Sequence, residues 1–296
     1  MLLPLIINTR RDTAMPHATQ LLIIDPQNDF CDLPPSHCPA DPATGQPLAP
    51  ALPVAGAHAD LQRLASFIQR QQAQIGAITL TLDSHHLIDI AHPPFWRTGA
   101  GGAVAPFTPI AAAQVRAGDF KPADAKALPR VLAYLDTLEA SQRYSLMVWP
   151  VHCQIGSWGQ GLHADVLAAC NAWERAHLQP VHAVAKGSNP WTEHYSALQA
   201  EVPDVADPAT ALNTALLRRL DSAQTLLIAG QASSHCVRAT VEHLVAHLPS
   251  GRPQRLVLLT DCMSPVTGFA PQASAFLQAM QARGVRLMTQ DQALAA

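Results

Sequence analysis

The sequence lacks the features that mark several large classes of protein. Its 296 residues hold only six cysteines, too few for the dense disulfide framework of a small secreted domain, so a reducing cytoplasm is the simpler interpretation. The formal net charge is −3 and the Lys and Arg residues are scattered, so no basic stripe indicates a nucleic-acid partner. No apolar run reaches membrane-spanning length, which argues against a membrane partner.

The first residues carry no convincing export signal. The apolar stretch MLLPLI (1–6) is too short for a signal core, and Arg10, Arg11 and Asp12 follow it closely. Met15 lies just before the first strand that the pattern predicts. We therefore expect an N-terminal extension over residues 1–15 and one folded domain over residues 16–296.

The sequence contains instead a repeated alternation of short apolar runs and helical patterns. Runs rich in Leu and β-branched residues are typical of strands that are buried on both faces of a sheet. Strands are predicted near 21–25, 76–83, 145–150, 182–186, 225–230, 255–261 and 285–289, and helices near 57–72, 163–178, 209–220, 235–247 and 271–283. This alternation predicts an α/β fold with a doubly wound, mostly parallel sheet and helices on both faces, in a strand order that the sequence leaves open.

Two stretches interrupt the alternation. Residues 31–53 and about 93–144 are rich in Pro, Ala and Gly and are loop-like, although 123–139 could form a helix. Long loops at the carboxyl ends of strands often cover ligand sites, and plain surface insertions are nearly as common. We predict loop insertions at both places and leave a role as lids open.

Three residues that could take part in catalysis lie at or after the ends of predicted strands. Asp25 closes the first strand, where Asp also commonly forms turns. Cys236 follows the strand at 225–230 and opens a helix, whose N–H groups and dipole favour a thiolate; a buried, inert cysteine is the competing interpretation. Lys186 ends the strand at 182–186, where its charge would stabilise a thiolate and lower the pKa of the acid, unless it is a solvated surface lysine.

A second group of residues could bind a metal ion. Asp83 and His85 end the second strand two residues apart, so an extended backbone would direct both side chains to one face. His152 and His92 are further candidates. Carboxylate and imidazole ligands suit Zn, Fe or Mn. In a chain with fourteen histidines, however, a chance Asp-x-His is unremarkable.

Taken together and in this chain order, these residues resemble the nicotinamidase branch of the isochorismatase-like cysteine hydrolases. The resemblance spans nearly the whole chain and is carried by DPQNDF (25–30), DSHH (83–86), WPVHCQIGSWGQGLH (149–163), KGSNPWTEHYSAL (186–198) and GQASSHCVRATVEHL (230–244). It implies that the catalytic triad is Asp25, Lys186 and Cys236. It also implies a divalent metal ion held by Asp83, His85 and His152, with His92 as a fourth ligand.

The resemblance further implies how a substrate would be held. Phe30 and Trp149 match the aromatic residues that sandwich a pyridine ring. A cis peptide bond between Gln231 and Ala232 would direct the N–H groups of Ala232 and Cys236 at the substrate oxygen, which makes an oxyanion hole. The implied activity is hydrolysis of a small carboxamide, such as nicotinamide to nicotinate and ammonia, through a thioester.

The sequence departs from the family pattern at the nucleophile loop. It has ASSHC (232–236) where nicotinamidases usually have Ala-Thr-Asp-x-Cys, so Ser234 replaces an acidic residue. A related amidase that acts on another small amide or an N-carbamoyl compound therefore stays open. A non-catalytic metal- or ligand-binding protein on the same scaffold is the alternative from another class, for which the complete Asp, Lys and Cys set is unexpected. Homo-oligomers are common among proteins of this kind.

Overall fold

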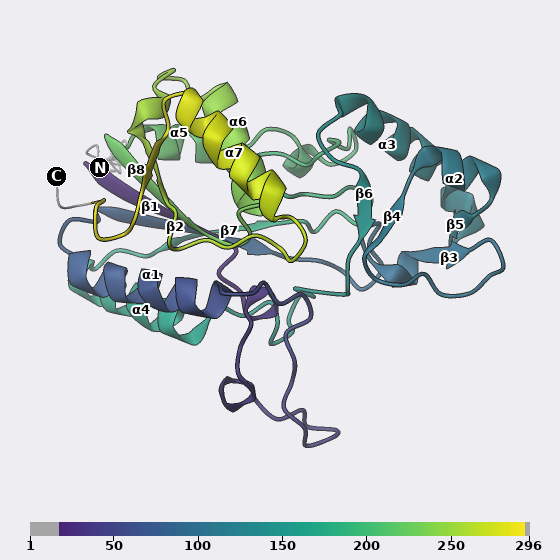
Figure 1. The fold of residues 1–296 in the computed structure, drawn as a ribbon, viewed down its shortest axis with the longest axis horizontal. Helices are drawn as coiled ribbons and strands as arrows, with labels where there is room; N and C mark the ends of the chain where they lie inside the picture. Colours follow the sequence, from purple (N-terminus) through teal and green to yellow (C-terminus); the bar gives the residue numbers. More distant parts are fainter. Residues whose placement is uncertain (1–17, 294–296) are drawn as a thin grey trace, which may run out of the picture.

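A six-stranded parallel sheet forms the centre of the molecule (Figure 1). The computed structural model describes residues 18–293, so the extension expected over residues 1–15 lies outside the described residues. The strands stand in the order β10-β9-β8-β1-β2-β7, and every pair of neighbours is parallel. Their bounds are β1 Thr19–Ile24, β2 Ala77–Asp83, β7 His182–Lys186, β8 Thr225–Gly230, β9 Leu256–Leu259 and β10 Arg286–Met288.

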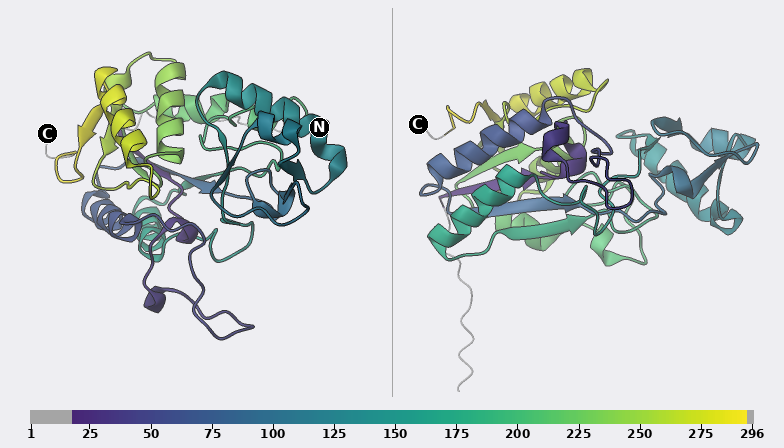
Figure 2. Two further views of the ribbon diagram at one scale, coloured as in Figure 1. Left: turned by 45° about the vertical axis from the view of Figure 1, so that its right-hand side comes forward. Right: turned by 90° about the horizontal axis from the view of Figure 1, so that it is seen from below.

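Helices cover both faces of this sheet, as the sequence predicted. Helices α1 (Ala57–Gln71) and α4 (Ala164–His177) lie on one face, and α5 (Thr214–Asp221), α6 (Cys236–His247) and α7 (Ala270–Ala282) lie on the other (Figures 1 and 2). The doubly wound α/β fold is therefore confirmed. Among the described residues, no helix is both long and apolar enough to cross a membrane.

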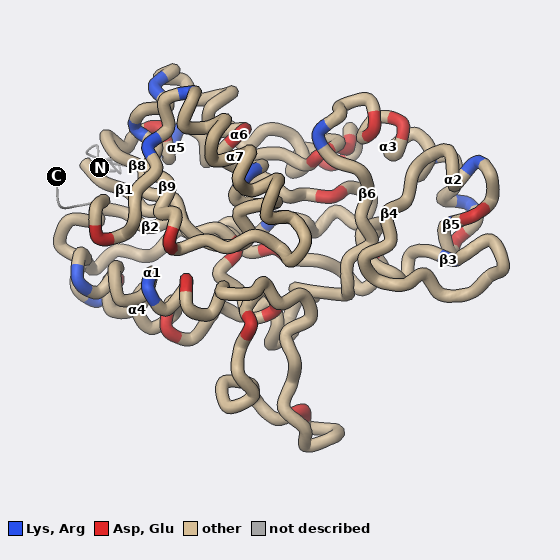
Figure 3. The backbone as a smooth tube through the Cα atoms, in the orientation of Figure 1, with Lys and Arg blue, Asp and Glu red and all other residues tan. Residues whose placement is uncertain are grey.

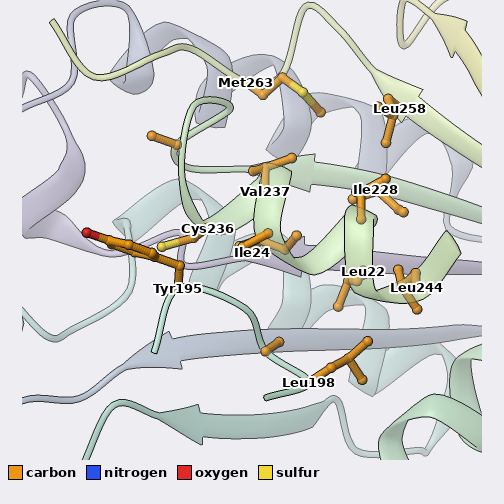
Figure 4. Packing of buried hydrophobic residues seen from close by; sticks show 14 of the residues in the cluster. Leu22, Ile24, Tyr195, Leu198, Ile228, Cys236, Val237, Leu244, Leu258 and Met263 are labelled. Atoms are coloured by element: carbon orange, nitrogen blue, oxygen red, sulfur yellow. The ribbon is translucent and has the colours of Figure 1, made fainter. Parts of the chain in front are cut away.

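Two hydrophobic cores result from the alternation of side chains along β1. Leu22 and Ile24 pack in the cluster that includes α6, whereas Leu21 and Ile23 pack against α1 and α4. Figure 4 shows the first cluster, where Val237 and other α6 side chains meet the sheet. Side chains of a strand alternate between the two faces, so a strand covered on both sides must be apolar throughout.

The order of the strands determines where a ligand can bind. The chain passes from β1 to β2 and β7 on one side, and it returns to the other side of β1 for β8, β9 and β10. Crevices in open α/β sheets form at such a reversal, beyond the carboxyl ends of the strands. Asp25 directly follows β1, and Cys236 follows β8, so both lie at this reversal.

The stretch 93–144 is not a loop, and the prediction for it was wrong. It folds into short strands, which are β3 Trp96–Thr98, β4 Thr108–Ile110 and β5 Phe120–Pro122, and into the helices α2 Ala112–Ala117 and α3 Leu128–Ser141. Helix α3 overlaps the region 123–139, where the sequence allows a helix, but it begins only at Leu128. Figure 1 shows this insertion projecting beyond the sheet at β2 and β7. It has a hydrophobic core of its own, which includes Trp96 and Leu135.

The predicted strand at 145–150 exists, but it belongs to the insertion. Strand β6 (Leu146–Val148) pairs antiparallel with β4 in a separate two-stranded sheet. The apolar pattern of a buried strand is the same in any sheet, so the sequence could not tell which sheet β6 joins.

The stretch 31–53 is irregular, as the sequence predicted, with one short 3-10 helix, Pro35–His37. It extends away from the body of the molecule (Figure 1). The other 3-10 helices are Asn28–Phe30, Pro93–Phe95, Ala125–Ala127, Pro208–Thr210 and Pro253–Arg255. In the view of Figure 3, Lys and Arg are dispersed among Asp and Glu, without a continuous basic stripe along the described chain.

Candidate active site

The side chains of Asp25, Lys186 and Cys236 meet at the carboxyl ends of β1, β7 and β8. The Lys186 Nζ lies 3.0 Å from Asp25 Oδ2 and 3.6 Å from Cys236 Sγ. All three side chains are nearly inaccessible to solvent. Residues far apart in the sequence therefore place an acid, an ammonium group and a thiol in direct contact.

The backbone and a neighbouring hydroxyl fix the position of Asp25. Its φ is 44°, in the left-handed region that Asp tolerates better than most residues. Its N–H donates to Thr81 Oγ1 at 3.0 Å, and the Thr81 hydroxyl donates back to Asp25 Oδ1 at 2.5 Å. Strand β2 thus orients the carboxylate of the residue that follows β1.

Burial dominates the electrostatics of the acid and the thiol. It raises the pKa of Asp25, and the opposing charge of Lys186 only partly offsets this effect. Lys186 lowers the pKa of Asp25, as the sequence predicted, but the larger effect of burial raises the net value. Burial also raises the pKa of the Cys236 thiol well above its usual value, although Lys186 again opposes the shift. In both groups burial favours the uncharged form, and the charge of Lys186 favours the ionised form.

Lys186 remains charged in this environment. Burial alone would lower its pKa, but the carboxylates of Asp25 and Asp83 hold it well above the usual value. Its ammonium group donates to Asp83 Oδ1 and to the carbonyl oxygen of His194, each at 3.0 Å. Asp83 and Lys186 are also register partners in the β2–β7 ladder, which explains their contact.

The loop before Cys236 is held by contacts to α1 and to the segment that follows β9. The peptide bond between Gln231 and Ala232 is cis. The Gln231 side chain donates to Asp60 on α1 at 3.0 Å and accepts from the Ser264 N–H at 3.2 Å. Cys236 is the first residue of α6.

Three N–H groups of this loop lack a hydrogen-bond acceptor in the described chain. Ser233, His235 and Val237 donate their N–H groups to backbone carbonyls, whereas those of Ala232, Ser234 and Cys236 have no such acceptor within residues 18–293. Of these three residues, Ala232 and Cys236 line the cavity beside the thiol, where an oxyanion would form.

The predicted metal ligands also come together. One ring nitrogen from each of His85, His92 and His152 lies within 4.8 Å of the other two. Asp83 Oδ2 is 3.2 Å from His85 Nε2 and 3.5 Å from His152 Nε2. Asp89 Oδ2 lies 3.0 Å from the other ring nitrogen of His85, Nδ1, and holds the orientation of the ring.

These four residues fit a divalent metal ion. The His85 Nε2 is buried and has no hydrogen-bond partner in the part of the chain that the structure describes, although Asp83 is close by. Buried polar atoms are rarely left without a partner, so an atom like this indicates a missing ligand. A carboxylate and three imidazoles are the donors that Zn, Fe and Mn accept.

A small cavity with aromatic walls lies between the thiol and the metal ligands. Phe30 and Trp149 line it together with Cys236, Asp83 and His152. The predicted substrate-binding pair is therefore brought to the same cavity as the reactive groups. The Phe30 ring packs edge-on against His152, with ring centroids 5.5 Å apart.

Sequence reasoning missed three polar or aromatic residues of this cavity, as well as the apolar Leu52 and Val266. Tyr195 and His235 contribute rings to its wall, and the Tyr195 hydroxyl accepts a hydrogen bond from Trp149 Nε1 at 3.0 Å. Figure 4 shows Tyr195 beside Cys236. Glu193 lines the cavity as well, and among the described residues its buried Oε2 has no partner. Glu193 lies only seven residues after Lys186, but it is in an irregular segment where no periodicity indicates the direction of a side chain.

Comparison with known proteins identifies the fold. No protein-family model and no curated protein matches the sequence. Solved structures do match, and their fold is that of nicotinamidases and pyrazinamidases. This agrees with the fold that the sequence resemblance implied.

Three of these structures show how far the likeness extends. The yeast nicotinamidase bound to the inhibitor nicotinaldehyde is 18% identical with a TM-score of 0.60, and the match covers 92% of this chain and 99% of that chain. The Acinetobacter baumanii nicotinamidase pyrazinamidase is 19% identical with a TM-score of 0.57, covering 94% and 99%. The Pyrococcus horikoshii pyrazinamidase in complex with zinc is 17% identical with a TM-score of 0.50, covering 92% and 99%.

Proposed function

We propose that this protein is a cysteine amidohydrolase that cleaves a small carboxamide, with nicotinamide as the first substrate to test. The observation that carries the proposal is the contact of Lys186 Nζ with both Asp25 Oδ2 and Cys236 Sγ, at 3.0 and 3.6 Å, beside a cavity with aromatic walls. Nucleophilic catalysis needs a thiol with a proton acceptor within reach, and Asp25 supplies that acceptor. The solved structures of similar fold include nicotinamidases, which supports the choice of substrate.

In the first half of the reaction, Asp25 acts as a base and then as an acid. Its carboxylate takes the proton of the Cys236 thiol, and the sulfur attacks the carbonyl carbon of the amide. The C–N bond then breaks as Asp25 returns the proton to the nitrogen, so ammonia leaves and a thioester remains.

Groups of the protein that are already in position stabilise the charge that develops during the reaction. The N–H groups of Ala232 and Cys236 are directed at the oxyanion of the tetrahedral intermediate. The ammonium group of Lys186 stabilises the thiolate, since it contacts Cys236 Sγ and keeps its charge in the buried site. These groups lower the barrier because they need no reorganisation as the charge appears.

In the second half, water replaces ammonia. The Asp25 carboxylate takes a proton from water, the hydroxide attacks the thioester carbon, and the C–S bond breaks. The proton then passes from Asp25 to the sulfur, which restores the thiol and releases the carboxylic acid.

A divalent ion, Zn, Fe or Mn, would be held by Asp83, His85, His92 and His152, and it would supply a Lewis acid that holds the ring nitrogen of a heteroaromatic amide. The zinc complex of the similar Pyrococcus horikoshii structure supports this assignment. Phe30 and Trp149 would hold the two faces of the ring, so that the amide carbon lies beside Cys236.

The experiment is ammonia release from nicotinamide by the wild type and by Cys236→Ala. We expect turnover by the wild type and none by the variant, with unchanged circular dichroism and metal content. The matched control is Cys38→Ala, which changes a cysteine in the 31–53 stretch and should leave the rate intact. Full activity of Cys236→Ala would refute the assignment of the nucleophile.

The serine at position 234 is the reason to test a second substrate class. Ser234 occupies the place of the usual acidic residue, and its hydroxyl accepts from the Val266 N–H at 3.1 Å and lies 2.9 Å from His235 Nδ1. Both of these neighbours line the cavity. A screen that includes other small amides and N-carbamoyl compounds would separate the two classes by their kcat/KM values.

A further inference from the structure

A second cavity lies next to the catalytic one. Its volume is about 220 Å³, and Tyr195 and His235 line both cavities, so these two rings form the wall between them. Neither the proposed reaction nor the metal ligands use the second cavity. It is smaller than the roughly 300 to 1,000 Å³ of pockets for drug-sized ligands, which limits an occupant to about one ring with a small substituent.

The second cavity contains two arginines arranged around an aromatic ring. The guanidinium carbons of Arg143 and Arg238 lie 5.5 and 5.3 Å from the centroid of the Tyr144 ring. Tyr144 also packs on the separating wall, with its ring centroid 4.8 Å from that of Tyr195 and 6.3 Å from that of His235. The cavity therefore combines aromatic surface with positive charge.

The two arginines differ in how many hydrogen-bond acceptors their guanidinium groups already have within the protein. Arg143 donates to Glu201, Glu242 and His243 at distances of 2.8 to 3.2 Å. Arg238 donates only its Nε, to Glu242 at 2.8 Å, and its two terminal nitrogens have no acceptor among residues 18–293. A guanidinium group presents its terminal N–H groups as a fork that matches a carboxylate.

The carboxylates of the cluster do not fully balance the two arginines. Glu242 is shared between Arg143 and Arg238. Burial raises the pKa of Glu201 to about 7, so this side chain carries only part of a negative charge near neutral pH. In addition, the Tyr144 hydroxyl is buried without a hydrogen-bond partner in the described chain. The cluster therefore retains positive charge and donor capacity for an anion.

We propose that the second cavity binds a small aromatic carboxylate, with the carboxylate on the free guanidinium nitrogens of Arg238 and the ring among Tyr144, Met147 and Phe269. These three side chains line the cavity and supply its apolar surface. The site is separate from the catalytic cavity, so this inference does not depend on the proposed hydrolysis.

Calorimetric titration with benzoate tests the proposal on the metal-free Cys236→Ala protein. Benzoate has no ring nitrogen to bind a metal ion, and this protein cannot form a thioester. We expect saturable binding to one site with a Kd of about 1 mM or lower. Arg238→Gln should weaken it about 10- to 100-fold, because a charge-assisted pair is lost. Arg238→Lys keeps the charge but not the forked N–H groups, so its affinity for benzoate should lie between those of the parent and of Arg238→Gln.

Three controls make the test decisive. Arg175→Gln changes an exposed arginine on α4 and should leave benzoate binding unchanged. Benzamide, which has the same shape without the charge, should bind equally to the parent and to Arg238→Gln, because any binding in the catalytic cavity does not involve Arg238. Inorganic phosphate should bind more weakly than benzoate, because it gains nothing from the aromatic walls. The proposal is overturned if benzoate does not bind, if Arg238→Gln binds it as well as the parent, if Arg238→Gln weakens benzamide as much as benzoate, or if phosphate binds as well as benzoate.

Discussion

At the scale of single residues, the reactivity of Asp25 depends on a hydroxyl from the neighbouring strand. Thr81 both accepts from the Asp25 N–H and donates to its carboxylate. The donated bond stabilises the charged form and lowers the pKa of Asp25, against the larger effect of burial. In the proposed mechanism Asp25 accepts the thiol proton, so Asp25 gains from this bond only while it is ionised.

We expect Thr81→Val to lower kcat/KM by about 10- to 100-fold, the effect of losing a hydrogen bond to a charged group. The pKa of Asp25 should rise further, so activity should be lost at a higher pH as the solution is acidified. The pH profile of kcat/KM measures both effects. Thr79→Val is the matched control, since Thr79 is buried on the same strand and, in the described chain, its hydroxyl has no partner. An unshifted acid limb in Thr81→Val would contradict the role given to Thr81.

The sequence predicted Asp25, Asp83 and Lys186 because each of them ends or directly follows an apolar run. A charged side chain at the end of a buried strand lies at the carboxyl edge of the sheet, which holds for these three residues. Glu193 and Tyr195 follow no strand and have no periodic neighbours, so only the folded chain shows that they reach the cavity. The direction of the Asp25 pKa shift was also beyond the sequence, because it depends on how completely the site is buried.

At the scale of elements, Asp29 joins two loops that carry the cavity wall. Its Oδ1 accepts from the Ala51 N–H at 2.9 Å and its Oδ2 from the Cys153 N–H at 2.7 Å. The first contact closes the 31–53 stretch, and the second fixes the segment that bears His152. Gly159 must be a glycine here, because a Cβ at this position would lie 2.1 Å from Asp29 Oδ2.

We expect Asp29→Asn to raise KM and weaken metal binding while kcat falls less. The amide group replaces one acceptor by a donor, which leaves a buried N–H without a partner at a cost of about 1–3 kcal/mol. Substrate titrations give KM and kcat, and elemental analysis gives the metal content. Asp41→Asn is the control, since Asp41 accepts from Ala43 and Thr44 in an exposed turn of the same stretch. Equal effects of the two substitutions would show that Asp29 has no special role.

The insertion should respond to mutation separately from the central sheet. Leu135 is fully buried in the core of the insertion, which is distinct from the two cores of the sheet. We expect Leu135→Ala to cost about 2–5 kcal/mol and to reduce hydrogen-exchange protection in α3, β4 and β6, with β1 and β8 unchanged. Uniform loss of protection across the molecule would show instead that the cores unfold as one.

The insertion also shows where prediction from sequence stops. Its strands are only three residues long, too short for an alternating pattern to stand out, and each includes or adjoins residues that are typical of loops. Pro109 and Pro122, for example, lie in β4 and β5. Short edge strands tolerate proline, whereas a central strand does not, so the composition resembled that of a loop.

At the scale of the whole molecule, stability should vary with pH through Glu201. Its pKa is raised from 4.5 to about 7 by burial, so above pH 4.5 the unfolded chain releases a proton that the folded chain retains. Stability from this group is present at low pH and is lost as the pH rises toward 7. Between pH 5 and pH 8 the loss should be on the order of 2 kcal/mol.

We expect Glu201→Gln to remove this dependence, because the amide does not titrate. Urea unfolding of the wild type and the variant at pH 5 and pH 8 gives the four free energies of unfolding, and their double difference isolates Glu201 from the other titrating groups. A double difference near zero would show that Glu201 is ionised at both pH values in the folded protein.

Because β6 pairs with β4, the residues of the candidate site are carried by two separate parts of the fold, the central sheet and the insertion. In the proposed reaction, the reacting side chains follow strands of the central sheet, whereas Trp149, one of the two residues proposed to hold the ring, directly follows β6 of the insertion. A chimera that exchanges only the insertion and β6 between relatives would therefore change one wall of the ring site while Phe30 and the residues proposed for the chemistry keep their places.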